Sequence, residues 1–263
     1  MKIGQPSSAL NSQALNQLNK NDQQLASGKR VNSAADDAAA LQIIDRLTSQ
    51  QNGYTQASRN AYDGISYAQV SESALGNVND AVSRIRELSI QAGNGALNDS
   101  DRQALQEEVA QLQEEIGTTL EQANFAGKPL FNGQNVSFQI GADAVQSKPY
   151  SAPNSDFLSA INSVDISTQA GVESALQVAD DAAQLVNEQR SQLGAFENAL
   201  SSNIRNLSQQ NENIAASQSR IQDADYARAV SERTSNDILN QASIALRGQA
   251  NQNAAAILGL LSS

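Results

Sequence analysis

A seven-residue repeat runs through residues 179–221, which read ADDAAQLVNEQRSQLGAFENALSSNIRNLSQQNENIAASQSRI. The apolar residue that returns at every seventh position is, in turn, Ala179, Val186, Leu193, Leu200, Leu207, Ile214 and Ile221. A strict heptad held over this length predicts a long helix that winds with a left-handed supercoil around a partner helix.

The partner predicted for this helix lies earlier in the chain, in a helix over about residues 34–92. Apolar residues there also follow alternating three- and four-residue steps: Ala61, Ile65, Ala68, Leu75, Val78, Val82, Ile85, then Leu88 or Ser89, and Ala92. Gly93 and Gly95 end this pattern, and Ser100 is predicted to cap a further helix with Gln103 as its capping-box partner. The apolar residues of that further helix are Leu105, Val109, Leu112 and Ile116.

A short β region is predicted where the prolines gather. Three of the four prolines are Pro129, Pro149 and Pro153. Residues 136–142 read VSFQIGA and alternate apolar with other residues, which is the two-residue period of a strand. A second strand over about 147–152 would complete a hairpin, and its prolines would confine it to an edge. The Ser- and Asn-rich residues that follow, up to about 169, are predicted to be loop.

The predicted fold class is therefore mainly α: a long antiparallel, coiled-coil-like helical hairpin or bundle with a small β-hairpin region and paired terminal helices. The first helix is expected over about 8–26, with Gly28 as its stop and Asn32 or Ser33 as the next cap. We expect residues 1–36 and 223–263 to form an inner domain. Residues 37–222 would form an outer domain, with its β-hairpin region near 130–155 and a loop to 170.

The two ends of the chain carry little charge. Between residues 238 and 263 the single charged side chain is Arg247, and apolar residues recur there at helical spacing. Pairing the ends with each other would still leave apolar faces in water. Other copies of the chain are the simplest cover, and a contact between copies that does not close into a ring produces a filament. The residues predicted to make these subunit contacts are Leu15, Leu18, Leu25, Leu239, Leu246, Ile257 and Leu261.

Composition argues against several functions. The formal net charge of −11 argues against nucleic acid and anionic membranes as partners. No apolar run is long enough to span a bilayer, and the N-terminus lacks the apolar core of a cleavable signal peptide. Histidine and cysteine are absent, which removes the usual nucleophilic triads and zinc sites. Adjacent carboxylates such as Asp36-Asp37 and Glu114-Glu115 are interpreted as solvated helix faces. No catalytic residue, metal site or cofactor is predicted.

Several long motifs in order carry a family resemblance. They are LASGKRVNSAADDAAALQIIDRLTSQ (25–50), VSRIRELSIQAGNG (82–95), ANFAGKPLFNG (123–133), NEQRSQLGAFENAL (187–200) and SRIQDADYARAVSERTSNDILNQASIALRGQANQNAAAILGLL (219–261). With these motifs the chain resembles bacterial flagellin over nearly all its length, in a minimal form without the variable outer domains.

This resemblance implies export through the flagellar secretion channel and assembly into a hollow helical filament for motility, outside the cell. The implied partners are further copies of the chain, a secretion chaperone, and the cap and hook-associated proteins. Arg84, Leu88 and Glu108 match positions by which similar flagellins engage a host Toll-like receptor, and the same face would contact the next subunit. The serines that would face outward and could carry O-linked sugars are Ser147, Ser151, Ser155, Ser159 and Ser163.

Three alternatives stay open at this stage. A hook-filament junction protein shares the terminal helices and is the nearest alternative, although it usually lacks the RIRELSIQA stretch in this form. An intracellular coiled-coil adaptor would suit a uniform heptad better than two uncharged ends. For the receptor surface, Leu88 could instead point into the bundle, because it also falls on the stripe that contains Val82 and Ile85.

Overall fold

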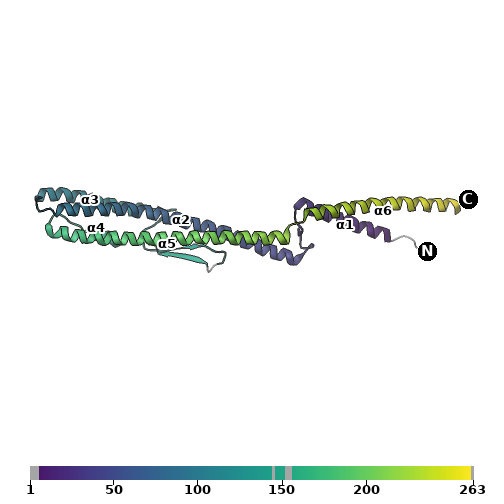
Figure 1. Cartoon of the computed structure of the whole chain (residues 1–263), viewed down its shortest axis with the longest axis horizontal. Coiled ribbons are helices and arrows are strands. Elements are labelled where there is room, and N and C mark those ends of the chain that lie inside the picture. Colours follow the sequence, from purple (N-terminus) through teal and green to yellow (C-terminus); the bar gives the residue numbers. More distant parts are fainter. Residues whose placement is uncertain (1–5, 144–145, 152–155, 262–263) are drawn as a thin grey trace. The chain divides into compact units, whose positions relative to one another are not determined.

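The computed structural model describes residues 6–143, 146–151 and 156–261, and the colours of Figure 1 follow the chain from the N-terminus to the C-terminus. Its helices are α1 (Pro6–Ser27), α2 (Ala38–Ala92), α3 (Asp99–Gln122), α4 (Asp156–Asn162), α5 (Gln169–Gln222) and α6 (Tyr226–Leu261). Its strands are β1 (Asn124–Phe125), β2 (Lys128–Pro129), β3 (Asn135–Gln139) and β4 (Ser147–Ser151). The predicted mainly α class with a small β region is confirmed.

The chain forms two compact units, and α2 and α5 each contribute to both. The terminal unit comprises residues 1–51 and 212–263, and the middle unit comprises residues 52–211. These limits fall inside the long helices, whereas the boundaries predicted from the sequence lie after residues 36 and 222.

The middle unit is a helical bundle whose core is the seam between α2, α3 and α5. The heptad positions of α5 from Ala179 to Leu207 are all buried, and so are the matching positions of α2 from Leu75 to Ala92. Ion pairs flank this seam on its solvent side, with Arg86 2.6 Å from Asp180 and Arg190 3.5 Å from Glu72. The heptad prediction therefore identified the faces that pack together in this unit.

Two antiparallel hairpins cover one side of the bundle. β3 and β4 pair antiparallel, as the predicted hairpin requires, and Pro149 lies opposite Ser137 at a strand that has only one neighbour. The shorter pair, β1 and β2, turns through Ala126 and Gly127, which have φ values of 51° and 80°. Glycine adopts this left-handed backbone without steric cost, so Gly127 allows the tight turn that joins β1 to β2.

The hairpins are fixed to the helices by an aromatic cluster. The ring of Tyr67 on α2 meets the rings of Phe125, Phe138 and Tyr150 edge-on, with centroids 5.7–5.9 Å apart. Phe196 on α5 completes the cluster against Phe138 and Tyr150. Edge-to-face packing of this kind adds to the gain from apolar burial, so the few aromatic residues of the chain hold the β region in place.

Three local predictions were wrong. The cap of α3 is Asn98, whose side chain accepts from the backbone of Asp101 at 2.9 Å while the Asp101 carboxylate accepts from the Asn98 amide, so the capping box begins two residues before Ser100. The segment predicted to be loop before 169 contains helix α4, which lies against α3. Helix α2 begins at Ala38, where the Asp37 carboxylate accepts from the Ala40 amide, and the residues before it form a turn.

Candidate functional site

The terminal unit is organised around the side-by-side helices α1 and α6 (Figure 1). Between α1 and α2 the chain leaves the helix at Gly28, whose φ of 68° favours glycine, and then runs beside the end of α5. The amide of Arg30 donates to the carbonyl of Gln222 at 2.6 Å, and the amide of Ala224 donates to the carbonyl of Gly28 at 2.9 Å. The Arg30 guanidinium also donates to the carbonyl of Ile221 at 2.6 Å. These bonds join two segments about 190 residues apart in sequence.

Asp36 ties α1 to the same turn. Its carboxylate lies 3.1 Å from the Lys20 ammonium and accepts from the amides of Asn32 and Ser33 at 3.2 and 3.1 Å. The hydrogen bond from Lys20 and those from the two amides hold the pKa of Asp36 below its ordinary value. Sequence reasoning interpreted Asp36 only as part of a solvated pair and missed this role. The motif SGKRVNSAADD indicated this role, because a carboxylate three residues after a serine can accept a hydrogen bond from the amide of that serine.

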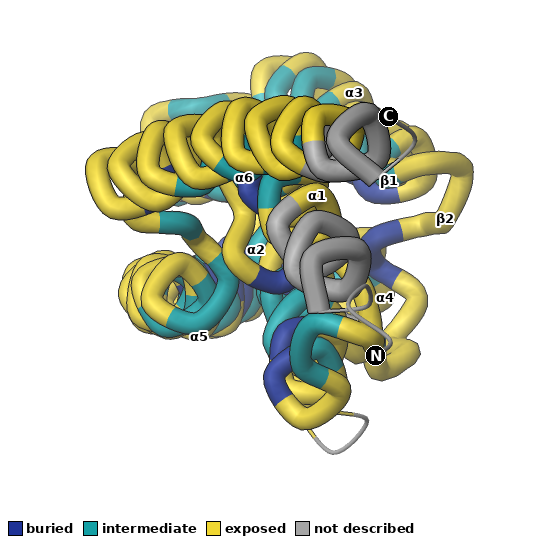
Figure 2. Tube along the Cα trace, turned by 90° about the vertical axis from the view of Figure 1, so that its right-hand side faces the viewer, coloured by how far each residue is buried: buried dark blue, intermediate teal, exposed yellow. Residues whose placement is uncertain are grey.

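The helix pair leaves most of its large apolar side chains in water. Figure 2 shows that α6 is exposed along most of its described length. The exposed fractions on α6 are 62% for Leu239 and 68% for Leu246, and Ile238 and Ile244 are similarly open. A soluble helix normally places its apolar stripe against a core, so this face lacks a partner within the described residues of the chain.

The predicted subunit-contact residues divide into three groups. Leu15, Leu239 and Leu246 are exposed, with Leu15 at 41%. Leu18 and Leu25 are half-buried between α1 and its neighbours. The side chains of the other two, Ile257 and Leu261, lie outside the described residues, although helix α6 extends to Leu261.

The charge of the chain is divided unequally between the two units. The terminal unit carries nine Lys and Arg against nine Asp and Glu, so its formal net charge is zero. The middle unit carries eight against 19 and holds the entire −11. The exposed apolar helices therefore belong to a unit that copies of the chain can bring together without net repulsion.

The predicted receptor surface is only partly exposed. The Arg84 guanidinium on α2 lies 2.7 Å from the Glu108 carboxylate on α3, and both side chains are about half in water. A second carboxylate, Glu87, lies 3.0 Å from Arg84, and hydrogen bonds to both carboxylates, with Glu108 first, raise the pKa of Arg84 further. Leu88 is only 1% exposed and packs in the core with Val82 and Ile85. Its assignment to an exposed contact face is therefore corrected in favour of the inward alternative.

The serines proposed for modification lie in and after the second hairpin. Ser147 and Ser151 are exposed on β4. Ser159 and Ser163 are exposed at α4 and just after it, and the Ser163 hydroxyl donates to the Ala160 carbonyl at 2.6 Å. Ser155 lies outside the described residues.

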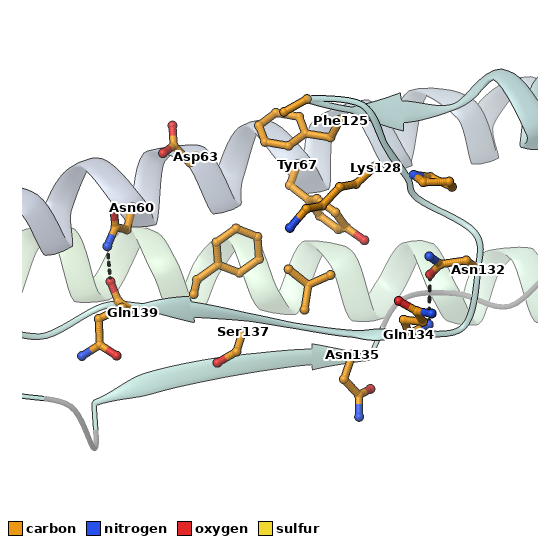
Figure 3. A pocket seen from close by; sticks show the side chains of 14 residues that line it. Asn60, Asp63, Tyr67, Phe125, Lys128, Asn132, Gln134, Asn135, Ser137 and Gln139 are labelled. Carbon is orange, nitrogen blue, oxygen red and sulfur yellow. Dashed lines mark hydrogen bonds between the residues drawn. The ribbon is translucent and has the colours of Figure 1, made fainter.

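The middle unit also has a pocket of about 740 Å³ between α2 and the hairpins (Figure 3). On one rim the Asn60 amide donates to the carbonyl of Gln139 at 2.9 Å. Burial raises the pKa of Tyr67, whose ring lines the pocket, above its ordinary value. Across the described segments, no cluster of three or more carboxylate, histidine or cysteine side chains could hold a metal ion. Within those same segments, no helix is long and apolar enough to cross a membrane.

This combination of a self-sufficient helical bundle and a neutral helix pair with exposed leucines defines a class: helical structural proteins that associate with further copies. Family models place the chain more narrowly. Residues 6–136 match the bacterial flagellin N-terminal helical region, and residues 176–261 match the bacterial flagellin C-terminal helical region.

Individual relatives agree with the family models. The flagellin of Bacillus subtilis is 36% identical over 99% of this chain and 100% of its own length. The flagellin of Halalkalibacterium halodurans is 40% identical over 94% of this chain and 93% of its own. Among solved structures, Bacillus cereus flagellin superposes with a TM-score of 0.52 at 27% identity, covering 61% of this chain and 94% of that one. A putative flagellar hook-associated protein from Vibrio parahaemolyticus gives a TM-score of 0.62 at 15% identity, covering 72% and 100%, and at that identity it shows a shared fold alone.

The chain belongs to the bacterial flagellin family. It is a structural subunit of the flagellar filament, and the hook-associated alternative is less well supported, because the relatives of high identity and both family models are flagellins.

Proposed function

We propose that α1 and α6 form the contacts by which copies of this flagellin polymerise into a hollow tube. The supporting observation is the exposure of Leu239 and Leu246 on a helix pair whose unit has no net charge. Apolar residues that remain in water in the free chain gain most from burial between copies. The middle unit buries its own core and would form the outer layer.

Further partners follow from the family rather than from contacts in the chain. They are a secretion chaperone before export, a cap at the growing end and hook-associated proteins at the base, with export through the flagellar secretion channel.

The exposed Arg84–Glu108 pair remains a proposed contact with the next subunit and with a host Toll-like receptor. Leu88 leaves that proposal because it is buried. O-linked sugars remain proposed for the exposed serines of the second hairpin and of α4.

Removal of residues 238–263 tests the role of the helix pair. The truncated chain should stay monomeric and helical, because the middle unit keeps its complete core. Electron microscopy and sedimentation after seeding with full-length filament fragments would measure polymerisation, and circular dichroism would confirm that the middle unit is folded. Filaments of normal diameter from the truncated chain would show that the contacts lie elsewhere.

A further inference from the structure

A shallow groove runs between α2 and α3 on the middle unit, and it shares no lining residue with the hairpin pocket. Its volume is about 590 Å³. The residues that line it are Ser66, Gln69, Val70, Ser73, Ala74, Asn77, Thr119, Gln122 and Ala123. On α2 the lining residues recur at steps of three and four, so they share one helix face, and from Ser66 to Asn77 that face extends over about 16 Å.

The groove is apolar in parts and open to water. Val70 within it is 40% exposed, and Tyr62, one helical turn before Ser66, is 57% exposed. These are two of the four large apolar side chains that the described part of the middle unit leaves in water, the others being Ile90 and Leu185. A tyrosine and a valine beside small residues give a surface that another helix can approach closely.

The groove is lined by uncharged residues, although the middle unit as a whole is strongly acidic. None of its nine lining residues is charged, although the middle unit has 19 acidic and eight basic residues. A cationic partner would be drawn to the acidic faces of the unit rather than to this groove. A second copy of the chain shares the charge of −11, so contact between two middle units is least opposed by repulsion where both surfaces are uncharged.

The same unit offers such a second surface on α5. Its members are exposed, uncharged and spaced by three or four residues: Ala195, Ala199, Ser202, Asn206 and Gln209. Because the groove and this α5 face are different surfaces, a contact between them is heterologous and repeats from copy to copy, as a filament requires.

We propose that the groove between α2 and α3 receives the α5 face of a neighbouring copy in the filament. The proposal rests on the filament function and adds where the middle units touch. Tyr62 flanks the groove and Val70 lines it, so assembly would cover both of these exposed side chains.

The absence of cysteine from the chain allows a direct test. Three single-cysteine variants would be made: Ser73→Cys in the groove, Ser202→Cys on the α5 face, and Ala110→Cys as the control. Ala110 is exposed on α3 between Glu107 and Glu114, and it is two residues from Glu108, so it lies on a different helix face from the Arg84–Glu108 pair. Reaction with a maleimide needs solvent access to the thiolate. The first two thiols should therefore react in filaments at no more than about one tenth of their rate in monomers. The control thiol should react at similar rates in both states.

A second measurement uses the same variants. A bulky maleimide adduct on Ser73→Cys monomers should block polymerisation, whereas the adduct on Ala110→Cys should not. Copies with Ser73→Cys mixed with copies with Ser202→Cys should be joined by a short bismaleimide in filaments, but not in monomers. Ser66→Cys serves as a second groove variant in case Ser73→Cys does not fold.

The outcomes of these experiments distinguish the groove contact from filament formation itself. Filaments in which the groove thiol reacts at the monomer rate would overturn the groove contact and leave the filament function intact. Protection of the groove without cross-linking to Ser202→Cys would overturn the α5 face as the mating surface. A failure of the unmodified chain to form filaments would instead contradict the proposed polymerisation itself.

Discussion

Replacing Leu246 by alanine isolates the contribution of one exposed leucine to polymerisation. Leu246 is 68% exposed in the free chain. Since full burial of a leucine side chain contributes about 1.5–3 kcal/mol, covering the remaining two thirds would contribute about 1–2 kcal/mol to each subunit addition. A tenfold change in an equilibrium constant corresponds to about 1.4 kcal/mol, so the critical concentration for polymerisation should rise about 5- to 30-fold in Leu246→Ala.

The assay is sedimentation of seeded filaments over a range of subunit concentrations. Gln241→Ala provides the matched control, because Gln241 is also exposed on α6 and contributes little apolar area. Neither substitution should change the free energy of unfolding of the monomer by more than about 0.5 kcal/mol, since both side chains lie largely in water. If Leu246→Ala polymerises at the concentration that the unmodified chain requires, the exposed face of α6 is not a subunit contact.

Three further predictions test individual residues. Leu88→Ala should lower the free energy of unfolding by about 2–5 kcal/mol because it empties a buried site, whereas Arg84→Ala should leave chemical denaturation nearly unchanged; equal effects would contradict the packing. Asn98→Ala should destabilise the protein by about 0.5–2 kcal/mol through loss of the α3 cap, and Ser100→Ala should have little effect in the same denaturation experiment. Because the pKa of Asp36 is lowered from its ordinary 3.8, its contribution to stability is fully present above that pH and is lost as the pH falls through the lowered value. Thermal unfolding followed through α1 should therefore show a larger loss on acidification for the unmodified chain than for Asp36→Asn, and parallel losses would refute the role of this carboxylate.

The long helices were predictable because their burial is periodic. A residue such as Leu193 or Leu200 is fixed by its position in the heptad, and every such position from Ala179 to Leu207 is buried. The pairing of β3 with β4 was also predictable, since both the alternation and the prolines restrict the register. In these segments local pattern and tertiary packing favour the same structure.

The helix ends and short elements were less predictable, because several residues compete for the same role. Asn98 and Ser100 can both cap a helix, and the choice depended on Asp101, whose carboxylate completes the capping box. Helix α4 has only seven residues, too few for a helical period to be seen. It is held by contacts from elsewhere in the chain: the Gln113 side chain donates to the carbonyls of Ile161 and Val164 at 2.8 and 3.1 Å.

The exposure of the proposed contact residues was predictable in part. The uncharged ends indicated exposed apolar helices, and Leu239 and Leu246 are exposed. Spacing alone placed Leu88 on the same face as Arg84, but a helix face is about 100° wide and a residue at its edge can point inward. Leu88 packs inward because it continues the buried stripe of Val82 and Ile85.

The two units differ in how many large apolar side chains they bury and expose. Of the twelve largest fully buried side chains in the described chain, only Val31 belongs to the terminal unit, whereas eight of the twelve exposed large apolar residues do. If α6 buried its leucines within the chain, the terminal unit would have much less apolar surface with which to join the copies. If the middle unit lacked its own core, free chains would expose apolar surface everywhere and associate without order. The middle unit carries the whole formal net charge of −11. Repulsion between like charges therefore opposes contacts between middle units least where their faces are uncharged. Under the two proposals, association is thereby guided to the neutral helix pair and to the groove beside α3.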